Sequence, residues 1–166
     1  MRDAARVARE GDGARIDMVE NVAEVLRFVL SDFAAALAAD PAGPEGIPGE
    51  LLFPDAYRRK ADSAEFRATY GQAMRSEVAA ATTRVIETWP DGQVVILDRA
   101  GVRDLRLVLV HAQVRYLRKP RWKTAPPDER YAKNDREVTS FWLQQLDRMI
   151  SGVVYVDPAE PIVYTL

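Results

Sequence analysis

The 166-residue sequence contains no cysteine, one histidine, and no apolar run near the ~20 residues that a membrane-spanning helix needs. Without cysteine there can be no disulfide, no thiol nucleophile and no cysteine-ligated zinc. A zinc site built on one histidine would need several carboxylates, and no HExxH motif occurs. The charged segment 1–17 lacks the apolar stretch of a signal peptide. We therefore expect a cytoplasmic protein that does not enter a membrane.

A strong net charge is also missing. The 23 basic and 25 acidic residues leave a formal charge of −2, so the molecule as a whole is not a polycation suited to nucleic acid. Hydrophobic residues make up 48% of the chain, which is typical of a folded globular protein. A chain of this length fits a single domain over residues 1–166 and can bury a core without metal or disulfides.

Four segments repeat apolar residues every three or four positions, which is the spacing of an amphipathic helix. The third segment is apolar on more than one face, so we expect it to be the most buried helix. The predicted helices run from an Asp17 cap to about Ala39, from an Asp62 cap to about Trp89, and over Arg99–Tyr116 and Arg136–Ser151.

Acidic residues stand where helix caps are expected. Asp17 and Glu20 have the spacing of a capping box, and Asp62 and Glu65 repeat it. Asp98 is placed to cap the third helix. Capping is a sufficient explanation for these carboxylates, so they give no indication of catalysis.

The remaining segments predict a small amount of β structure. Gly11-Asp12-Gly13 favours a tight turn between two short strands, and residues 93–97 form a β-rich run. We expect a loop rich in proline and glycine over 41–50, an irregular basic loop over 118–135, and an extended, β-prone tail over 152–166. The predicted fold is mostly α with minor β, with about four amphipathic helices around one core.

The segment "LLFPDAYRRK" places large apolar side chains in a connection between helices. Pro54 suits the first position of a short helical turn that would put Phe53 and Tyr57 on one side. We favour a segment that anchors to the core over an exposed docking surface. In the second interpretation, Leu52, Phe53 and Tyr57 are the candidate partner-binding residues.

No catalytic motif stands out. The chain has no phosphate-binding glycine loop and no GxSxG elbow. His111 lies among apolar neighbours in the third helix, which favours a structural role. We therefore expect no enzymatic activity and no cofactor, and we keep a carboxylate site that sequence cannot reveal as an alternative.

A basic stretch follows the third helix. Cations neutralise phosphates and aromatic rings stack on bases, so this stretch is a candidate nucleic-acid site. We favour the simpler interpretation of a solvated loop whose positive charge suits the end of a helix. The candidate nucleic-acid-binding residues are Arg115, Arg118, Lys119, Arg121, Trp122 and Lys123.

Three stretches resemble an actinobacterial family of domains of unknown function: "LLFPDAYRRKADSAEFR", "LRLVLVHAQVR" and "SFWLQQLDRMI". The resemblance runs from the hairpin to the fourth helix and is specific at Leu52–Tyr57 and Glu65–Arg67. The chain departs from the family in a short interval before Asp104–Leu109 and in an added tail after Ser151. Genes of that family tend to lie beside the gene for the adaptor of the Clp protease, which implies a link to regulated proteolysis. The family has no established catalytic residues to carry over.

Three functional hypotheses follow. The leading one is a non-enzymatic intracellular protein that acts through protein–protein contacts, as a regulator or adaptor near a protease. The alternatives are a nucleic-acid-binding regulator using residues 115–123 and an enzyme with an unrecognised carboxylate site. A homodimer through the β-prone tail is a further expectation, because unpaired strand edges invite pairing.

Overall fold

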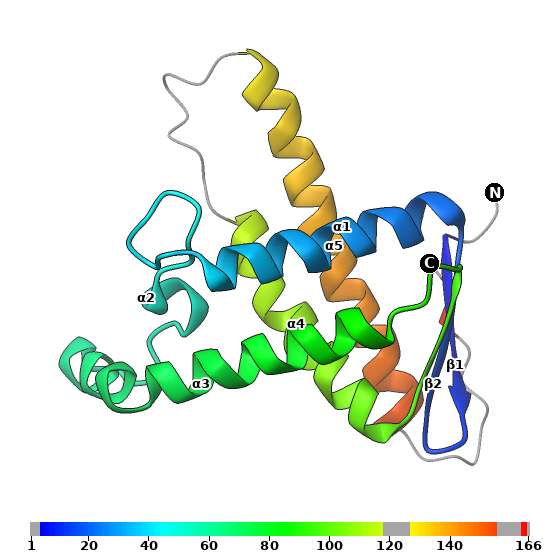
Figure 1. Cartoon of the computed structure of the whole chain (residues 1–166), viewed down its shortest axis with the longest axis horizontal. Coiled ribbons are helices and arrows are strands. Elements are labelled where there is room, and N and C mark those ends of the chain that lie inside the picture. Colours follow the sequence, from blue (N-terminus) through cyan, green and yellow to red (C-terminus); the bar gives the residue numbers. More distant parts are fainter. Residues whose placement is uncertain (1–3, 118–126, 156–163, 166) are drawn as a thin grey trace.

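The computed structural model describes residues 4–117, 127–155 and 164–165, with side chains described over 4–116 and 138–155. The described residues form a mostly helical fold with a small sheet at one end (Figure 1), which confirms the predicted fold class. The helices are α1 (Glu20–Ala38), α2 (Gly49–Leu52), α3 (Lys60–Thr88), α4 (Arg99–Leu117) and α5 (Pro127–Tyr155). The strands are β1 (Ala5–Glu10), β2 (Gly13–Met18), β3 (Val94–Leu97) and β4 (Tyr164–Thr165).

The sheet is antiparallel, with strand order β3-β2-β1-β4. Val7 pairs with Ile16, which pairs with Val95 on its other side, and all three are buried beneath the helices. The predicted hairpin is confirmed, and Gly11 supplies the positive φ of 58° at its turn. The strand predicted near 93–97 is confirmed as β3. The two residues of β4 pair with β1, so this part of the tail joins the hairpin of its own chain.

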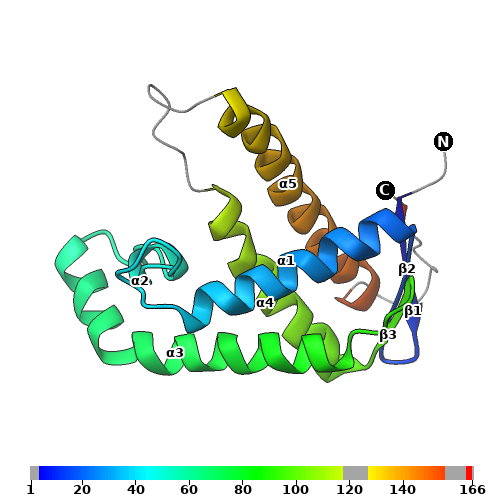
Figure 2. The same cartoon turned by 45° about the horizontal axis from the view of Figure 1, so that its top comes forward.

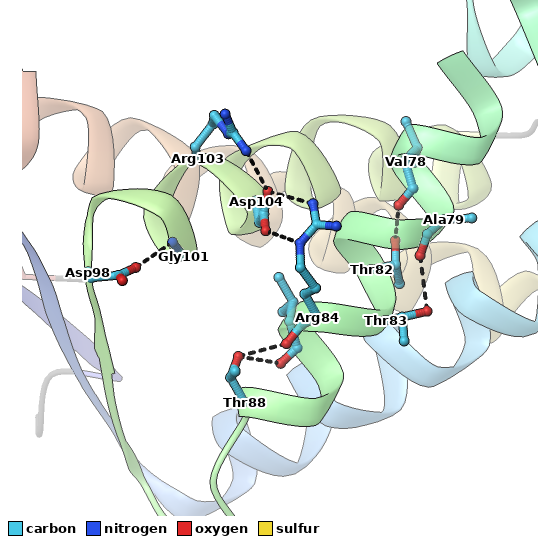
Figure 3. Close-up of polar contacts among 11 residues, drawn as sticks. Val78, Ala79, Thr82, Thr83, Arg84, Thr88, Asp98, Gly101, Arg103 and Asp104 are labelled. Atoms are coloured by element: carbon cyan, nitrogen blue, oxygen red, sulfur yellow. Dashed lines mark hydrogen bonds and ion pairs between the residues drawn. The ribbon is translucent and has the colours of Figure 1, made fainter. Parts of the chain in front are cut away.

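The central element is α4, which contacts α1, α2, α3, α5, β2 and β3. Its buried side chains form one broad face, Leu107 and Val114 beside it are partly buried, and Val110 is exposed, so the helix is buried on fewer sides than the sequence predicts. Asp98 caps it: the Oδ1 atom accepts a hydrogen bond of 2.7 Å from the backbone N–H of Gly101 (Figure 3). The buried apolar side chains of α4 are Val102, Leu105, Val108, Leu109 and Ala112.

The other two predicted caps are wrong. Asp17 lies in β2, where it pairs with Arg15 at 3.0 Å, and the residue at the N-cap of α1 is Val19, which makes no side-chain cap bond. The pairing of β2 with both of its neighbours holds Asp17 in the strand, and this outweighs its capping tendency. Asp62 lies inside the first turn of α3, where a negative charge favours the positive end of the helix dipole.

The last helix is longer than predicted. α5 begins at Pro127, where a proline at the first position costs no hydrogen bond, and continues to Tyr155. Residues 127–135 are therefore helical rather than irregular, and residues 152–155 are helical rather than extended. The rest of the predicted basic loop, 118–126, and the tail residues 156–163 lie outside the described residues.

The helical turn predicted after Pro54 occurs before it. The turn is α2, which has Pro48 at its N-cap and starts inside the predicted 41–50 loop. Proline disfavours helical geometry in the residue that precedes it, so the turn ends before Phe53. The displacement matters because it buries Leu52 and Phe53 instead of placing Phe53 beside Tyr57.

The longest helices differ in shape. α3 bends in its amino-terminal half, which contains Gly71, the one glycine of the helix (Figure 2). A glycine inside a helix costs about 1 kcal/mol relative to alanine. α5 packs its carboxyl-terminal half against α4 and the sheet, while its amino-terminal half projects away from the other helices (Figure 2). Within the described ranges, no helix is long and apolar enough to cross a membrane.

One buried ion pair joins α3 to α4. Asp104 is buried, and its two carboxylate oxygens accept hydrogen bonds from Arg84 Nε at 2.6 Å and Arg84 Nη2 at 3.0 Å (Figure 3). The guanidinium stabilises the charged carboxylate and lowers the pKa of Asp104. Asp104 is therefore a permanently ionised anchor between the two helices at neutral pH.

We predict that Asp104→Asn lowers the free energy of unfolding at pH 7 by about 1–2 kcal/mol, a modest value for a charged hydrogen bond because water screens the half-exposed Arg84. Because the folded-state pKa of Asp104 is lowered, its stabilising contribution is present above the unfolded-state pKa of about 4 and is lost as the pH falls through the folded-state pKa. Denaturant unfolding at pH 7 and at pH 3 measures this.

The deficit of the variant should be largest at pH 7 and smaller at pH 3, where the carboxylate begins to be protonated in the unfolded chain. Glu87→Gln, at an exposed acid of α3, is the control and should leave stability unchanged. A deficit of Asp104→Asn that is as large at pH 3 as at pH 7 would contradict the assigned role of the charge.

Candidate functional site

A groove runs between α1 and the projecting part of α5. It encloses about 410 Å³. Among the side chains that the structure describes, its lining is almost entirely aliphatic or aromatic and includes no acid or base. The lining residues are Asn21, Val22, Val25, Leu26 and Val29 of α1 and Val138, Thr139, Trp142 and Leu143 of α5.

Large apolar side chains stand exposed along this groove. Val25 and Phe28 are one turn apart on α1, and Val138 and Phe141 are one turn apart on α5. Val25 is 51% exposed and Val138 is 54% exposed, and both line the groove. Phe28 and Phe141 are also exposed on these two helices, outside the lining. Burying one such side chain is worth roughly 1.5–3 kcal/mol, so a partner that covers several of them gains a large part of a binding free energy. Clustered exposure of this kind marks interaction surfaces.

Sequence reasoning recognised only part of this surface. The apolar spacing of the fourth predicted helix indicates that Val138 and Phe141 face inward, and the structure exposes both. Ser140 and Leu143 beside Phe141 are buried, so Phe141 is exposed because it lies on the other face of α5. The sequence does contain one sign of exposed apolar residues: Phe28 does not share the three- and four-residue spacing of the apolar residues that predict the first helix.

Charged contacts fix both walls of the groove to α4. Arg115 donates to both oxygens of Asp32 on α1, at 2.6 and 2.9 Å. Arg106 donates to Asp147 on α5 at 2.8 Å, and its guanidinium lies 5.1 Å from the centre of the Tyr155 ring. The bidentate Arg115–Asp32 pair sets the orientation of α1 as well as its distance from α4, and the Arg106–Asp147 bond holds α5 beside α4. The gap between α1 and α5 is therefore a defined feature of the fold.

The candidate segment 51–57 is divided by the structure. Leu52 is 1% exposed and Phe53 is 8% exposed, so both lie in the core, as the favoured interpretation predicted. Tyr57 is half exposed, and its ring packs edge-on against Phe66. The three residues therefore do not share one exposed surface, and the docking interpretation does not hold for them as a set.

His111 contributes to the burial of this segment. Its ring meets the Phe53 ring edge-on at 5.4 Å, and its Nδ1 atom lies 3.2 Å from the carbonyl oxygen of Leu52. Burial lowers the pKa of His111, so the neutral ring is favoured at neutral pH. These contacts give His111 a packing role, as expected from its apolar neighbours.

Of the candidate nucleic-acid residues, only Arg115 is described. Its charge is already paired with Asp32, and Nη1 also donates to the carbonyl oxygen of Glu45 at 3.2 Å. The hydrogen bond to Asp32 raises the pKa of this guanidinium. Arg118, Lys119, Arg121, Trp122 and Lys123 lie outside the described residues, so nucleic-acid binding through them stays a prediction.

Metal and acid–base chemistry find little support in the part of the chain that is described. No group of three histidine, aspartate or glutamate side chains lies close enough there to hold a metal ion. The buried Asp104 has a lowered pKa and a bidentate partner, which is the opposite of what a general base requires. The tail strand β4 pairs within its own chain, so a homodimer through the tail also stays a prediction.

Comparison with known families gives one match. The model of a domain of unknown function, DUF2017, covers residues 2–138. The chain belongs to this family. No curated protein and no solved structure matches the chain. The DUF2017 match includes the hairpin, α1 to α4 and the start of α5. It ends at Val138, which lines the groove. The stretch "SFWLQQLDRMI", which carries part of the resemblance, therefore lies beyond the matched residues.

The exposed apolar surface can be tested in the isolated protein. We predict that Val25→Gln combined with Val138→Gln lowers the fluorescence of an apolar dye bound in the groove at least twofold. The free energy of unfolding should change by no more than about 0.5 kcal/mol, because both side chains are half exposed. Val110→Gln, at an exposed valine of α4, is the control. Equal loss of signal in the control and the double variant would contradict the assignment.

Proposed function

We propose that this DUF2017 protein works without catalysis, by binding a partner protein in the groove between α1 and α5. The observation that carries the proposal is the exposure of apolar side chains on both walls of one groove: Val25 of α1 and Val138 of α5 line it and are half exposed. Such a surface is costly to leave in water. A protein partner that covers both walls removes that cost and supplies specificity through shape.

The shape of the groove favours an amphipathic helix as the bound segment. Both walls are helices, and a third helix placed between them would pack its ridges into theirs, as in a helical bundle. A small molecule would fill the hollow but would leave Phe28 exposed, because Phe28 is outside the lining of the groove. A helix presents side chains over several turns and can cover the hollow and its rim together.

Charged residues at the rim of the groove indicate which charges the bound helix should carry. Glu20 and Glu24 are exposed one turn apart on α1, beside the lining residues Asn21 and Val25. On the other wall, Gln144 and Gln145 are neutral. A helix with an apolar face and lysine or arginine along one flank would therefore complement this rim, and the charges would fix its orientation.

We also propose that the protein acts as a regulator or adaptor in regulated proteolysis. This role is supported by the resemblance to a family encoded beside the adaptor of the Clp protease. That support is an association between genes, so the partner must be identified directly.

Crosslinking in the native cell tests both the groove as the binding surface and the link to proteolysis. We predict that a photoreactive amino acid in place of Val25 or Val138 captures the same protein, and that the same group in place of Val110 does not. All three positions are exposed, so the chemistry is matched and only the surface differs. Mass spectrometry of the crosslinked band identifies the partner and the peptide it contributes.

The identity of the captured protein separates these two proposals. A component of the proteolytic machinery would support the regulatory role, and an unrelated protein would remove the link to proteolysis while leaving the groove as the binding surface. Equal capture from position 110, or capture from neither groove position, would overturn the groove as the site.

A further inference from the structure

A second, smaller pocket lies between α2 and the amino-terminal half of α3. It encloses about 180 Å³ and is separate from the groove. Unlike the groove, it has charged side chains in its lining, and both are arginines. Its lining includes Gly49 and Phe53 on one side and Arg67, Gly71, Gln72 and Arg75 of α3 on the other.

The two arginines and the glycine between them share one face of α3. Arg67, Gly71 and Arg75 are spaced four residues apart, so they follow one another along the helix. A Cβ atom at Gly71 would meet only the Cβ of Arg67, at 3.9 Å. Space therefore remains open where any other residue would place a side chain. The missing side chain keeps a hollow between two guanidinium groups.

Arg75 brings a positive charge that its own contacts do not neutralise. Its Nη1 atom donates to the carbonyl oxygen of Ile47 at 2.8 Å, and Nη2 donates to that of Leu37 at 3.0 Å. Both acceptors are uncharged, and no ion pair of Arg75 is found among the described residues. A guanidinium has five N–H donors, so these two bonds hold it in place and leave donors for a ligand.

Arg67 is also held in position. Its Nη1 atom donates to Asp55 at 2.8 Å and to the carbonyl oxygen of Phe53 at 3.3 Å. Both bonds are made by the same nitrogen atom, so other donors of the guanidinium remain. Asp55 offsets one of the two positive charges, and Asp55 is not part of the pocket lining. Over the described residues, the lining carries two cations, one neutral amide and no acid.

We propose that this pocket binds a small oxyanion, the phosphate or carboxylate group of a small molecule. Planar guanidinium groups match the spacing of oxyanion oxygens, and they bind them better than a lysine would because they offer paired donors. Two prepositioned arginines also lose little side-chain freedom when the ligand binds. The site needs no partner protein and stands independently of the groove.

Isothermal titration at low ionic strength tests the proposal with inorganic phosphate and, separately, with citrate and acetate as carboxylate probes. We expect saturable binding of one of the two chemical classes of probe, phosphate or carboxylate. Gln72→Glu should weaken it at least tenfold and Gln72→Lys should strengthen it, because Gln72 is exposed and each change alters only the charge at the rim. Gly71→Leu should abolish binding by filling the hollow. Ala73→Leu, on the exposed face of the same helix, should bind as the native protein does.

The two classes of probe distinguish the source of the oxyanion: phosphate alone indicates a phosphorylated ligand, and citrate or acetate alone indicates a carboxylic acid. Absence of saturable binding by every probe would overturn the proposal. So would equal affinities of the Gln72→Glu, Gln72→Lys and native proteins, because an anion bound in this pocket must respond to charge at position 72.

Discussion

The burial of α4 is the constraint on which the rest of the structure depends. This helix contacts α1, α2, α3, α5 and two strands, so each of these elements must turn an apolar surface toward it. Its charged residues then orient the neighbours: Arg106 holds α5, Asp104 holds α3, and Arg115 holds α1. Because α1 and α5 are both fixed to α4, the space between them is set by a third element, and the two helices are not free to close it.

The two proposed sites use different chemistry and different parts of the molecule. The groove offers apolar area with acidic residues at its rim, and this suits another polypeptide. The pocket beside α2 offers two fixed guanidinium groups around a hollow, and this suits an oxyanion. Both involve α1, because Arg75 bonds to the carbonyl oxygen of Leu37 near its carboxyl end, and α1 lines the groove. In both cases the chain contributes rigid surfaces and no reactive group.

Local sequence patterns predicted the elements better than they predicted their surroundings. The hairpin at Gly11, the strand β3 and the helix after Asp98 follow from turn chemistry, β propensity and capping, which are local forces. Asp17 was misassigned because strand pairing, a non-local force, decides its position. The exposure of Phe141 was not predicted either, because the spacing placed it with the inward-facing residues, whereas the structure buries Ser140 and Leu143 and leaves Phe141 on the outer face of α5. The pocket needed the structure too, since the sequence does not show that Phe53 approaches Gly71.

Amide hydrogen exchange of the free chain and of the chain bound to its partner tests the central claim most directly, because it reports every helix at once. The account predicts that α4 exchanges most slowly in both states, since it can open only when the whole core does. It also predicts that the partner slows exchange in residues 20–38 and 138–146 and nowhere else to a comparable degree. Protection that appears instead on the sheet or along α3, with α1 and α5 unchanged, would contradict the account.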